Sequence, residues 1–105
     1  MLTPDSSAID GATKVRFIWD PNKAAANSRK HRVSFEEAST VFADDLAATG
    51  ADPDHSVSEN RWITFGQSAR GRLLAVSHTE EEEDIIRVIS ARPATPQERK
   101  LYEEG

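Results

Sequence analysis

The sequence predicts an α+β domain: an antiparallel β-sheet of about four to five strands, with two N-terminal helices on one face and a short C-terminal helix. Two capped helical segments come before residue 47, and a third ends the chain. Between residues 61 and 92 lie three apolar-rich segments, joined by two short polar connectors. Connectors this short pair strands antiparallel, because a parallel pair needs a long crossover. We expect the second face of the sheet to stay partly open.

The chain begins with a polar segment and a strand. Residues 1–13 contain Pro4, Gly11 and two serines, which predicts a flexible N-terminal extension before a single domain of residues 14–105. The segment KVRFIW, residues 14–19, alternates and is rich in aromatic and β-branched side chains. It is therefore the first predicted strand.

Asp20 and Pro21 mark the start of the first helix, because an aspartate caps free N–H groups and proline suits the first helical position. The helix is predicted to end near His31. Nitrogen-bearing side chains recur on it every four residues, and a further lysine borders them: Lys23, Asn27 and His31, with Lys30. The helix is thus expected to present one polar, nitrogen-rich edge.

The second helix begins at a capping box formed by Ser34 and Glu37. Its apolar stripe consists of Phe35, Ala38, Val41, Phe42 and Leu46. Gly50, Asp52 and Pro53 then predict a loop.

Three strands are predicted at residues 61–66, 72–79 and 85–92, with residues 80–84 (EEEED) as a solvated hairpin turn. The segment SVSEN, residues 56–60, could add a further strand. After the last strand, Thr95-Pro96-Gln97-Glu98 repeats the capping pattern and starts the C-terminal helix. That helix offers only Leu101 and Tyr102 as apolar residues, so we expect it to dock weakly.

Composition excludes several classes of protein. The 105 residues include no cysteine, which rules out disulfides, thiolate metal sites and cysteine nucleophiles. The chain has no apolar run near the roughly 18 residues of a membrane span, and its start lacks the features of a secretory signal, so a cytoplasmic protein is expected. The net charge is −5, but positive and negative residues are separated along the chain: residues 14–32 carry six Lys or Arg and one acid.

Several spaced motifs resemble one protein family. They are F-x-W-D-x-x-K-x-x-x-N-x-x-K-H-x-V-S-F-E-E-A from Phe17, RW-x-x-x-G from Arg61, R-L-L-A-V from Arg72, and I-R-V-I-S-A-R-x-A-T-x-x-E-R from Ile86. Together these motifs, which span about residues 15–102, resemble the BrnT toxins of bacterial type II toxin–antitoxin pairs, which have a RelE-like ribonuclease fold. The chain departs from the usual family pattern at Arg32, where a glycine is common, at His78, where many members carry tyrosine, and in its acidic run.

The resemblance implies an endoribonuclease that cleaves RNA and inhibits translation. It also implies neutralisation by a BrnA-like antitoxin, which is similar to ribbon-helix-helix DNA-binding proteins. We expect operator DNA to be bound only through the antitoxin complex, and the weakly held C-terminal helix to be where a partner could displace or extend this chain. No cofactor is expected. A metal is not expected either, because the three histidines lack H-x-x-x-H or H-E-x-x-H spacing.

Metal-free RNA cleavage needs a base for the 2′-hydroxyl, cations for the phosphate charge and an acid for the leaving 5′-oxygen. Arginine suits the phosphate and histidine suits proton transfer near neutral pH. The candidate catalytic residues are Arg87, Arg92, His31, Lys30 and Arg61. The candidate substrate-binding residues are Lys23, Asn27, Arg72 and His78.

Each candidate also has a structural interpretation. His31 could cap the end of its helix, and Arg92 could bridge the sheet to the last helix. His78 could be a surface residue paired with the neighbouring glutamates. Strict alternation puts Arg87 and Arg92 on opposite faces of their strand, so the two compete for the ligand-facing place. The alternative function is a non-catalytic RelE-like module that binds protein or nucleic acid.

Overall fold

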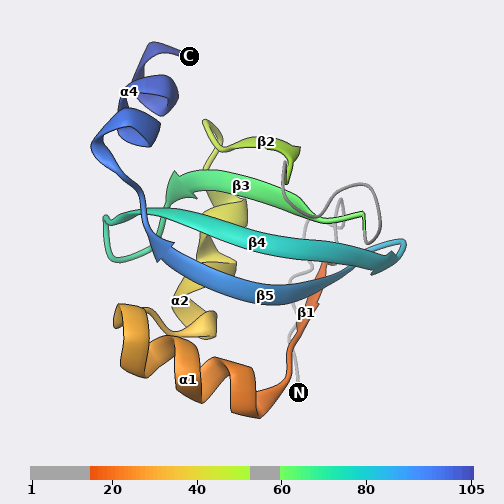
Figure 1. Ribbon diagram of the computed structural model, residues 1–105. Helices are drawn as coiled ribbons and strands as arrows, with labels where there is room; N and C mark the ends of the chain where they lie inside the picture. Colours follow the sequence, from red (N-terminus) through yellow and green to blue (C-terminus); the bar gives the residue numbers. More distant parts are fainter. Residues whose placement is uncertain (1–14, 53–59) are drawn as a thin grey trace.

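The computed structural model describes residues 15–52 and 60–105, so the predicted extension at residues 1–13 lies outside the described part. The elements follow one another as β1 (Arg16–Ile18), α1 (Pro21–His31), α2 (Phe35–Ser39), the 3₁₀ helix η2 (Thr40–Ala43), β2 (Ala48–Ala51), β3 (Trp62–Gln67), β4 (Leu73–Glu82), β5 (Ile85–Pro93) and α4 (Pro96–Glu104). Figure 1 shows α1 and α2 beside a twisted sheet, with α4 at the end of the sheet where β5 finishes.

The sheet is mixed and has the strand order β1-β5-β4-β3-β2. Strands β3, β4 and β5 pair antiparallel, as expected, and β2 also pairs antiparallel with β3. In contrast, β1 runs parallel to β5, with Arg16 opposite Ile85. The prediction of a purely antiparallel sheet is therefore wrong at this one pair. The rule for short connectors does not apply to β1 and β5, because the helices and three other strands separate them along the chain.

Strand β2 occupies a segment that was predicted to be a loop. Its four residues, Ala48–Ala51, pair with β3, and all of them are exposed. They are small and show no apolar alternation, which is why the sequence does not reveal them as a strand. The strand suggested for residues 56–60 falls almost wholly outside the described residues, and Asn60 is not in a strand.

The second helix is shorter than predicted. Ser34 caps it as expected, since its Oγ accepts from the N–H of Glu37 at 3.0 Å. The reciprocal half of the capping box is absent, because the carboxylate of Glu37 bonds to Ser68 and Arg72 instead. Leu46 does not join the apolar stripe: it follows η2 in a turn and is 73% exposed.

The core lies between the sheet and the segment that includes α2 and η2. Its fully buried apolar residues are Val33, Phe35, Ala38, Val41, Leu74, Val76, Val88 and Ala91. Gly66 permits the close approach of η2 to β3, because a Cβ there would lie 2.9 Å from Cγ1 of Val41. Helix α4 adds no buried residue, as its composition predicted, and Leu101 is 67% exposed. No helix in the described ranges is long and apolar enough to cross a membrane.

Candidate functional site

Helix α1 begins and ends where the sequence predicts. Oδ1 of Asp20 accepts from the N–H of Asn22 at 2.7 Å, and Pro21 follows as the first helical residue. At the other end Arg32 adopts a left-handed conformation, with φ 59°, and its N–H donates to the carbonyl of Ser28. A glycine reaches this conformation without strain, which accounts for the glycine that the family pattern has here. The last turn carries basic side chains, and positive charge there stabilises the helix because its carbonyl end is the negative end of the helix dipole.

The polar edge predicted on α1 divides into two parts. Lys23 is exposed and His31 is partly exposed, but Asn27 is buried. Nδ2 of Asn27 donates to the carbonyls of Val33 and Ala91, each at 2.9 Å, and Oδ1 accepts from the N–H of Ala91 at 3.1 Å. Both amide hydrogens of Asn27 are used by the backbone, so its contacts are those of a structural residue and not of a substrate ligand.

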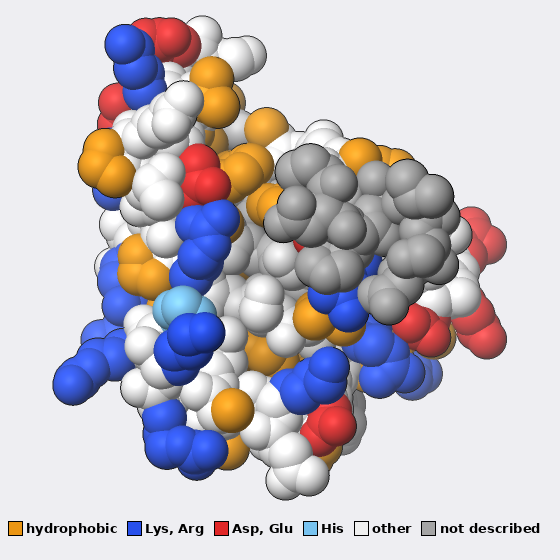
Figure 2. All heavy atoms as spheres, viewed as in Figure 1, with side chains coloured by type: hydrophobic (Ala, Val, Ile, Leu, Met, Phe, Trp, Pro, Cys, Tyr) orange, Lys and Arg blue, Asp and Glu red, His pale blue; other side chains and the backbone are white. Residues whose placement is uncertain are grey.

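The exposed basic residues of α1 form a surface that we call the α1 cationic surface: Lys23, Arg29, Lys30 and Arg32. None of the acids in residues 15–52 and 60–105 forms an ion pair with these four side chains. Figure 2 shows Lys and Arg side chains gathered around a histidine on the side of the molecule where α1 lies. Unpaired cations on one surface attract polyanions.

Arg87 and Arg92 lie on the same face of β5, contrary to the strict alternation of the sequence. Thr79 of β4 is opposite Arg87, and Ala75 is opposite Arg92; these two β4 residues are four apart and share a face. A register shift at Ser77 and His78 leaves one residue of β5 without a partner, and this bulge changes the parity of the strand. The two arginines therefore do not compete, and both point away from the core.

Both arginines have acidic neighbours. Nη1 and Nη2 of Arg92 donate to Oε1 and Oε2 of Glu98 at 2.7 and 2.9 Å, so Arg92 bridges the sheet to α4. Arg92 is nevertheless 37% exposed, and Arg87, whose Nε donates to Glu81 at 3.1 Å, is 41% exposed. The Arg92 guanidinium lowers the pKa of the Glu98 carboxyl to about 2.

Arg72 lies immediately before β4, one residue outside the strand that was predicted to begin with it, and its contacts are structural. Its Nε donates to Oε2 of Glu37 at 2.9 Å, its Nη2 donates to Oε1 of the same carboxylate, and Nη2 also donates to the carbonyl of Arg32. The side chain of Glu37 is almost fully buried, and its hydrogen bond with Arg72 lowers its pKa. Arg72 therefore ties α2 and the end of α1 to the start of β4.

His78 is buried in the core, contrary to both the substrate-binding and the surface interpretations. Its side chain is 1% exposed, lies edge-on to Phe42 with ring centroids 4.9 Å apart, and shares a 2.8 Å hydrogen bond between Nε2 and Oγ1 of Thr64. Burial lowers its pKa to about 4. The strand predicted to end near Thr79 continues to Glu82, so His78 lies inside β4 and not at its end. His78 is therefore neither accessible to a substrate nor able to exchange a proton near neutral pH.

Arg61 immediately precedes β3 and is partly exposed; its carbonyl accepts from the N–H of Asp52 at 2.9 Å. It lies on the far side of β4 from β5 in the strand order. Of the nine predicted site residues, five are accessible or partly accessible on α1 and β5: Lys23, Lys30, His31, Arg87 and Arg92.

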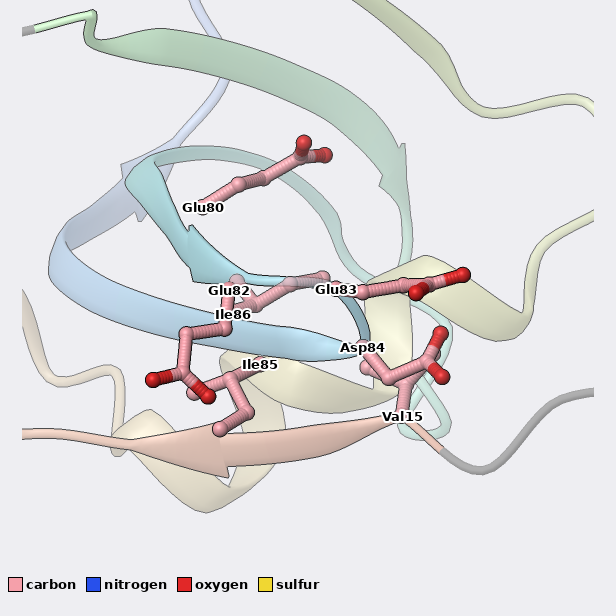
Figure 3. A pocket seen from close by; sticks show the side chains of 7 residues that line it. All are labelled: Val15, Glu80, Glu82, Glu83, Asp84, Ile85 and Ile86. Atoms are coloured by element: carbon pink, nitrogen blue, oxygen red, sulfur yellow. The ribbon is translucent and has the colours of Figure 1, made fainter.

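The acidic run forms a separate hollow of about 380 Å³ beside β1, lined by Val15, Ile85, Ile86, Glu80, Glu82, Glu83 and Asp84. Glu80 and Glu82 extend β4, and only Glu83 and Asp84 form the hairpin turn. Figure 3 shows the carboxylates of Glu83 and Asp84 on one side and those of Glu80 and Glu82 pointing elsewhere. Within the described ranges, no three His, Asp, Glu or Cys side chains are placed to hold a metal ion.

The sequence suggested that Arg92 could bridge the sheet to the last helix, which the structure confirms, but it did not identify the acidic partner of either arginine. Glu98 was predicted only as a helix-capping residue, although it also binds Arg92. A short connection between the end of a strand and a capped helix was the available signal, because it keeps Arg92 and the first helical turn close together. Glu81 was assigned to a solvated turn, but it lies in β4 and reaches Arg87.

The fold and site define a small α+β protein with a five-stranded mixed sheet and an accessible cationic surface. Residues 19–98 match the family described as the ribonuclease toxin BrnT of type II toxin–antitoxin systems. The crystal structure of the Brucella abortus ribonuclease toxin BrnT is similar, with a TM-score of 0.62 and 22% sequence identity over 77% of this chain and 97% of that one. No curated protein sequence matches the chain.

The family match covers most of the chain, so this protein belongs to the BrnT family of ribonuclease toxins of type II toxin–antitoxin systems. The similarity to the Brucella structure supports the fold independently.

Proposed function

We propose that this protein is a metal-independent endoribonuclease of the cytoplasm, which cleaves RNA and thereby inhibits translation. The observation that carries the proposal is the placement of Arg87 and Arg92 on one face of the sheet, both accessible. Two guanidinium groups on one face can bind successive phosphates of an RNA strand, and one of them can stabilise the charge that develops at the scissile phosphate.

The α1 cationic surface supplies further phosphate contacts, and His31 supplies proton transfer. In the proposed reaction the 2′-oxygen bonds to phosphorus while the bond to the 5′-oxygen breaks. The 2′-hydroxyl proton passes to a base, and the departing 5′-oxygen receives a proton from an acid. His31, at the end of α1 and partly exposed, is the histidine of the described residues that solvent and RNA can reach. Lys30 and Lys23 bind neighbouring phosphates, and Arg61 is proposed as a more distant contact.

Cleavage of purified RNA in excess EDTA tests this function. Wild-type protein is expected to cleave, and Arg87→Ala or Arg92→Ala is expected to lose most of the activity while remaining folded by circular dichroism. Arg99→Ala is the matched control, because Arg99 is an exposed arginine of α4 whose ion pair with Glu103 lies within that helix. Full activity of both site variants would place the reaction elsewhere, and loss of wild-type cleavage only with EDTA would refute metal independence.

A substitution of His31 separates its two interpretations. If His31 only interacts with the helix end, His31→Asn should cost at most about 1–2 kcal/mol of stability and leave cleavage intact. The proposed role predicts the opposite pattern, with lost cleavage and little change in melting temperature. Unchanged cleavage by His31→Asn would assign the residue to the helix end.

We further propose that a BrnA-like antitoxin with a ribbon-helix-helix DNA-binding portion neutralises this chain, and that operator DNA binds only through the complex. An acidic antitoxin segment would complement the α1 cationic surface, so association should weaken as salt rises. Co-expression with the neighbouring short gene, followed by size-exclusion chromatography at low and high salt, measures this. Two separate peaks at low salt, with undiminished toxicity, would contradict the partner.

A non-catalytic binding module is the second candidate. It is favoured by one observation, the pairing of Arg87 and Arg92 with Glu81 and Glu98, which neutralises both guanidinium groups in the free protein. Induced expression distinguishes the two candidates, because a ribonuclease toxin should arrest growth and degrade RNA, whereas a binding module should bind its partner without either effect.

A further inference from the structure

The hydrogen bonds of Arg92 leave one defined edge of its guanidinium available. Arginine has five N–H donors. Nη1 donates to Glu98 Oε1 at 2.7 Å and to the carbonyl of Pro93 at 3.3 Å, and Nη2 donates to Glu98 Oε2 at 2.9 Å. The two remaining donors, on Nε and Nη2, lie side by side on the same edge. Two parallel donors on one edge are the geometry that binds a phosphate with two hydrogen bonds.

The carboxylate that holds Arg92 is itself fixed from the opposite direction. Glu98 is the third residue of α4, and its Oε1 also accepts from the N–H of Thr95 at 2.9 Å. Oγ1 of Thr95 in turn accepts from the N–H of Glu98 at 3.1 Å. Reciprocal capping fixes the position of the carboxylate relative to the start of the helix. The guanidinium therefore binds an acceptor that has little freedom to move.

Arg87 lacks a comparable support. It donates to Glu81 through Nε alone, at 3.1 Å, and both residues are about two-fifths exposed. A single exposed contact leaves rotation about the long side chain largely free. Of the two arginines on this face, only Arg92 is thus held in one orientation before a ligand arrives.

We propose that Glu98 is a positioning residue, which holds Arg92 so that its free Nε–Nη2 edge faces the RNA phosphate. The inference rests on the proposed ribonuclease function and adds to it a role for α4. This helix buries no residue, so its contribution to the core is small. Its first turn instead provides the support for a phosphate-binding arginine.

A double-mutant cycle with a matched control tests this proposal. The variants are Arg92→Ala, Glu98→Gln, the double substitution and Glu103→Gln. Glu103 is a suitable control, because it is also a glutamate of α4 in an ion pair with an arginine, Arg99. The substitution thus removes the same charge from the same helix away from Arg92. Cleavage of a labelled single-stranded RNA gives kcat/KM, and thermal unfolding measures folding.

Glu98→Gln is expected to lower kcat/KM about tenfold with the domain still folded, since loss of alignment at a catalytic contact has effects of this order. Glu103→Gln should change it less than about twofold, the scale of an exposed ion pair. In the Arg92→Ala background Glu98→Gln should have no further effect, because a residue that acts only through Arg92 has nothing left to position.

The possible failures are distinguishable. An active Arg92→Ala variant would overturn the catalytic site of the proposed function. Loss of activity in Arg92→Ala but not in Glu98→Gln would overturn the positioning role alone. A Glu98→Gln defect that persists unchanged in the Arg92→Ala background, or a gain of activity in Glu98→Gln, would also overturn it, since either result separates Glu98 from the orientation of Arg92.

Discussion

Arg92 lies on β5 and Arg72 immediately before the neighbouring strand β4; they are the same residue type, yet their contacts differ. Arg72 uses its Nε edge on buried Glu37, whereas Arg92 binds Glu98 through its end and keeps the Nε edge free. The sequence identified both as phosphate-binding candidates, because residue type and strand position were the only information available. Their roles depend on their acidic partners. Glu37 is 35 residues from Arg72, too far for a local sequence pattern to reveal the pair, whereas Glu98 is only 6 residues from Arg92.

His78 predicts a specific dependence of stability on pH. Its pKa falls from 6.5 to about 4 on folding, because burial disfavours the charged ring. A depressed pKa means that the neutral ring contributes fully above pH 6.5, and that the contribution is lost as pH falls through 4. Between these values the free energy of unfolding should fall by about 3 kcal/mol from this group.

The comparison of wild type with His78→Gln isolates that contribution, since the amide does not titrate and can still reach Thr64. Urea unfolding at pH 7, 5.5 and 4.5 should show a difference between the two proteins that shrinks as pH falls. A constant difference across this range would mean that His78 does not titrate on unfolding as described. The carboxyl groups of Glu37 and Glu98 are common to both proteins and cancel.

Asn27 should be important for stability. Replacement by alanine leaves the N–H and carbonyl of Ala91 and the carbonyl of Val33 without a partner in a buried place. Unsatisfied buried groups cost about 1–3 kcal/mol each, so Asn27→Ala should lose about 3 kcal/mol or more. Asn22→Ala is the control on the same helix, because Asn22 is exposed. Equal urea midpoints for the two variants would contradict the structural role.

At the scale of elements, the capping residues were the most informative feature of the sequence. Asp20, Ser34 and Thr95 each begin a helix as predicted, because a cap acts on backbone groups within three residues of itself. The three apolar-rich strands are also present at nearly the predicted bounds. Strand β2 could not be predicted, since its exposed small residues owe their conformation to pairing with β3.

The attachment of α2 to the sheet depends on the pair of Glu37 and Arg72. Glu37→Gln should leave the Arg72 guanidinium without its charged partner and lower the free energy of unfolding by about 3 kcal/mol. Glu36→Gln is the matched control, because the neighbouring Glu36 is exposed. The measurement is urea unfolding of both variants at pH 7. A loss no larger than that of Glu36→Gln would show that the pair contributes little.

At the scale of the whole molecule, two long-range features escaped the sequence. The parallel pairing of β1 with β5 joins segments separated by almost the entire domain, and no local signal specifies it. The bulge that brings Arg87 and Arg92 to one face exists only in relation to β4. The predicted α+β class is correct. That Arg87 and Arg92 share a face could be learned only from the register of β5 against β4.

The segregated charge predicts the salt dependence of RNA binding. The double substitution Lys23→Gln and Lys30→Gln removes two cations from the α1 cationic surface. Each lost phosphate contact should reduce the slope of log affinity against log salt by about 0.7, so the slope should fall by about 1.4. Fluorescence anisotropy of a labelled single-stranded RNA at several salt concentrations measures it. Lys100→Gln, on exposed α4, should leave the slope unchanged, and an equal change there would contradict a localised surface.

The hydrogen bonds of Asn27 also bear on self-association. Strand β1 covers β5 only from Ile85 to Arg87, so the rest of that strand edge has no neighbouring strand among the described residues. The amide of Asn27 occupies this edge at Ala91, with one bond given and one received, as a peptide group of a further strand would do. Uncovered strand edges are templates for other chains. Asn27 thus blocks the pairing of this edge with a strand of another molecule. Its replacement should increase aggregation even at temperatures where the protein remains folded.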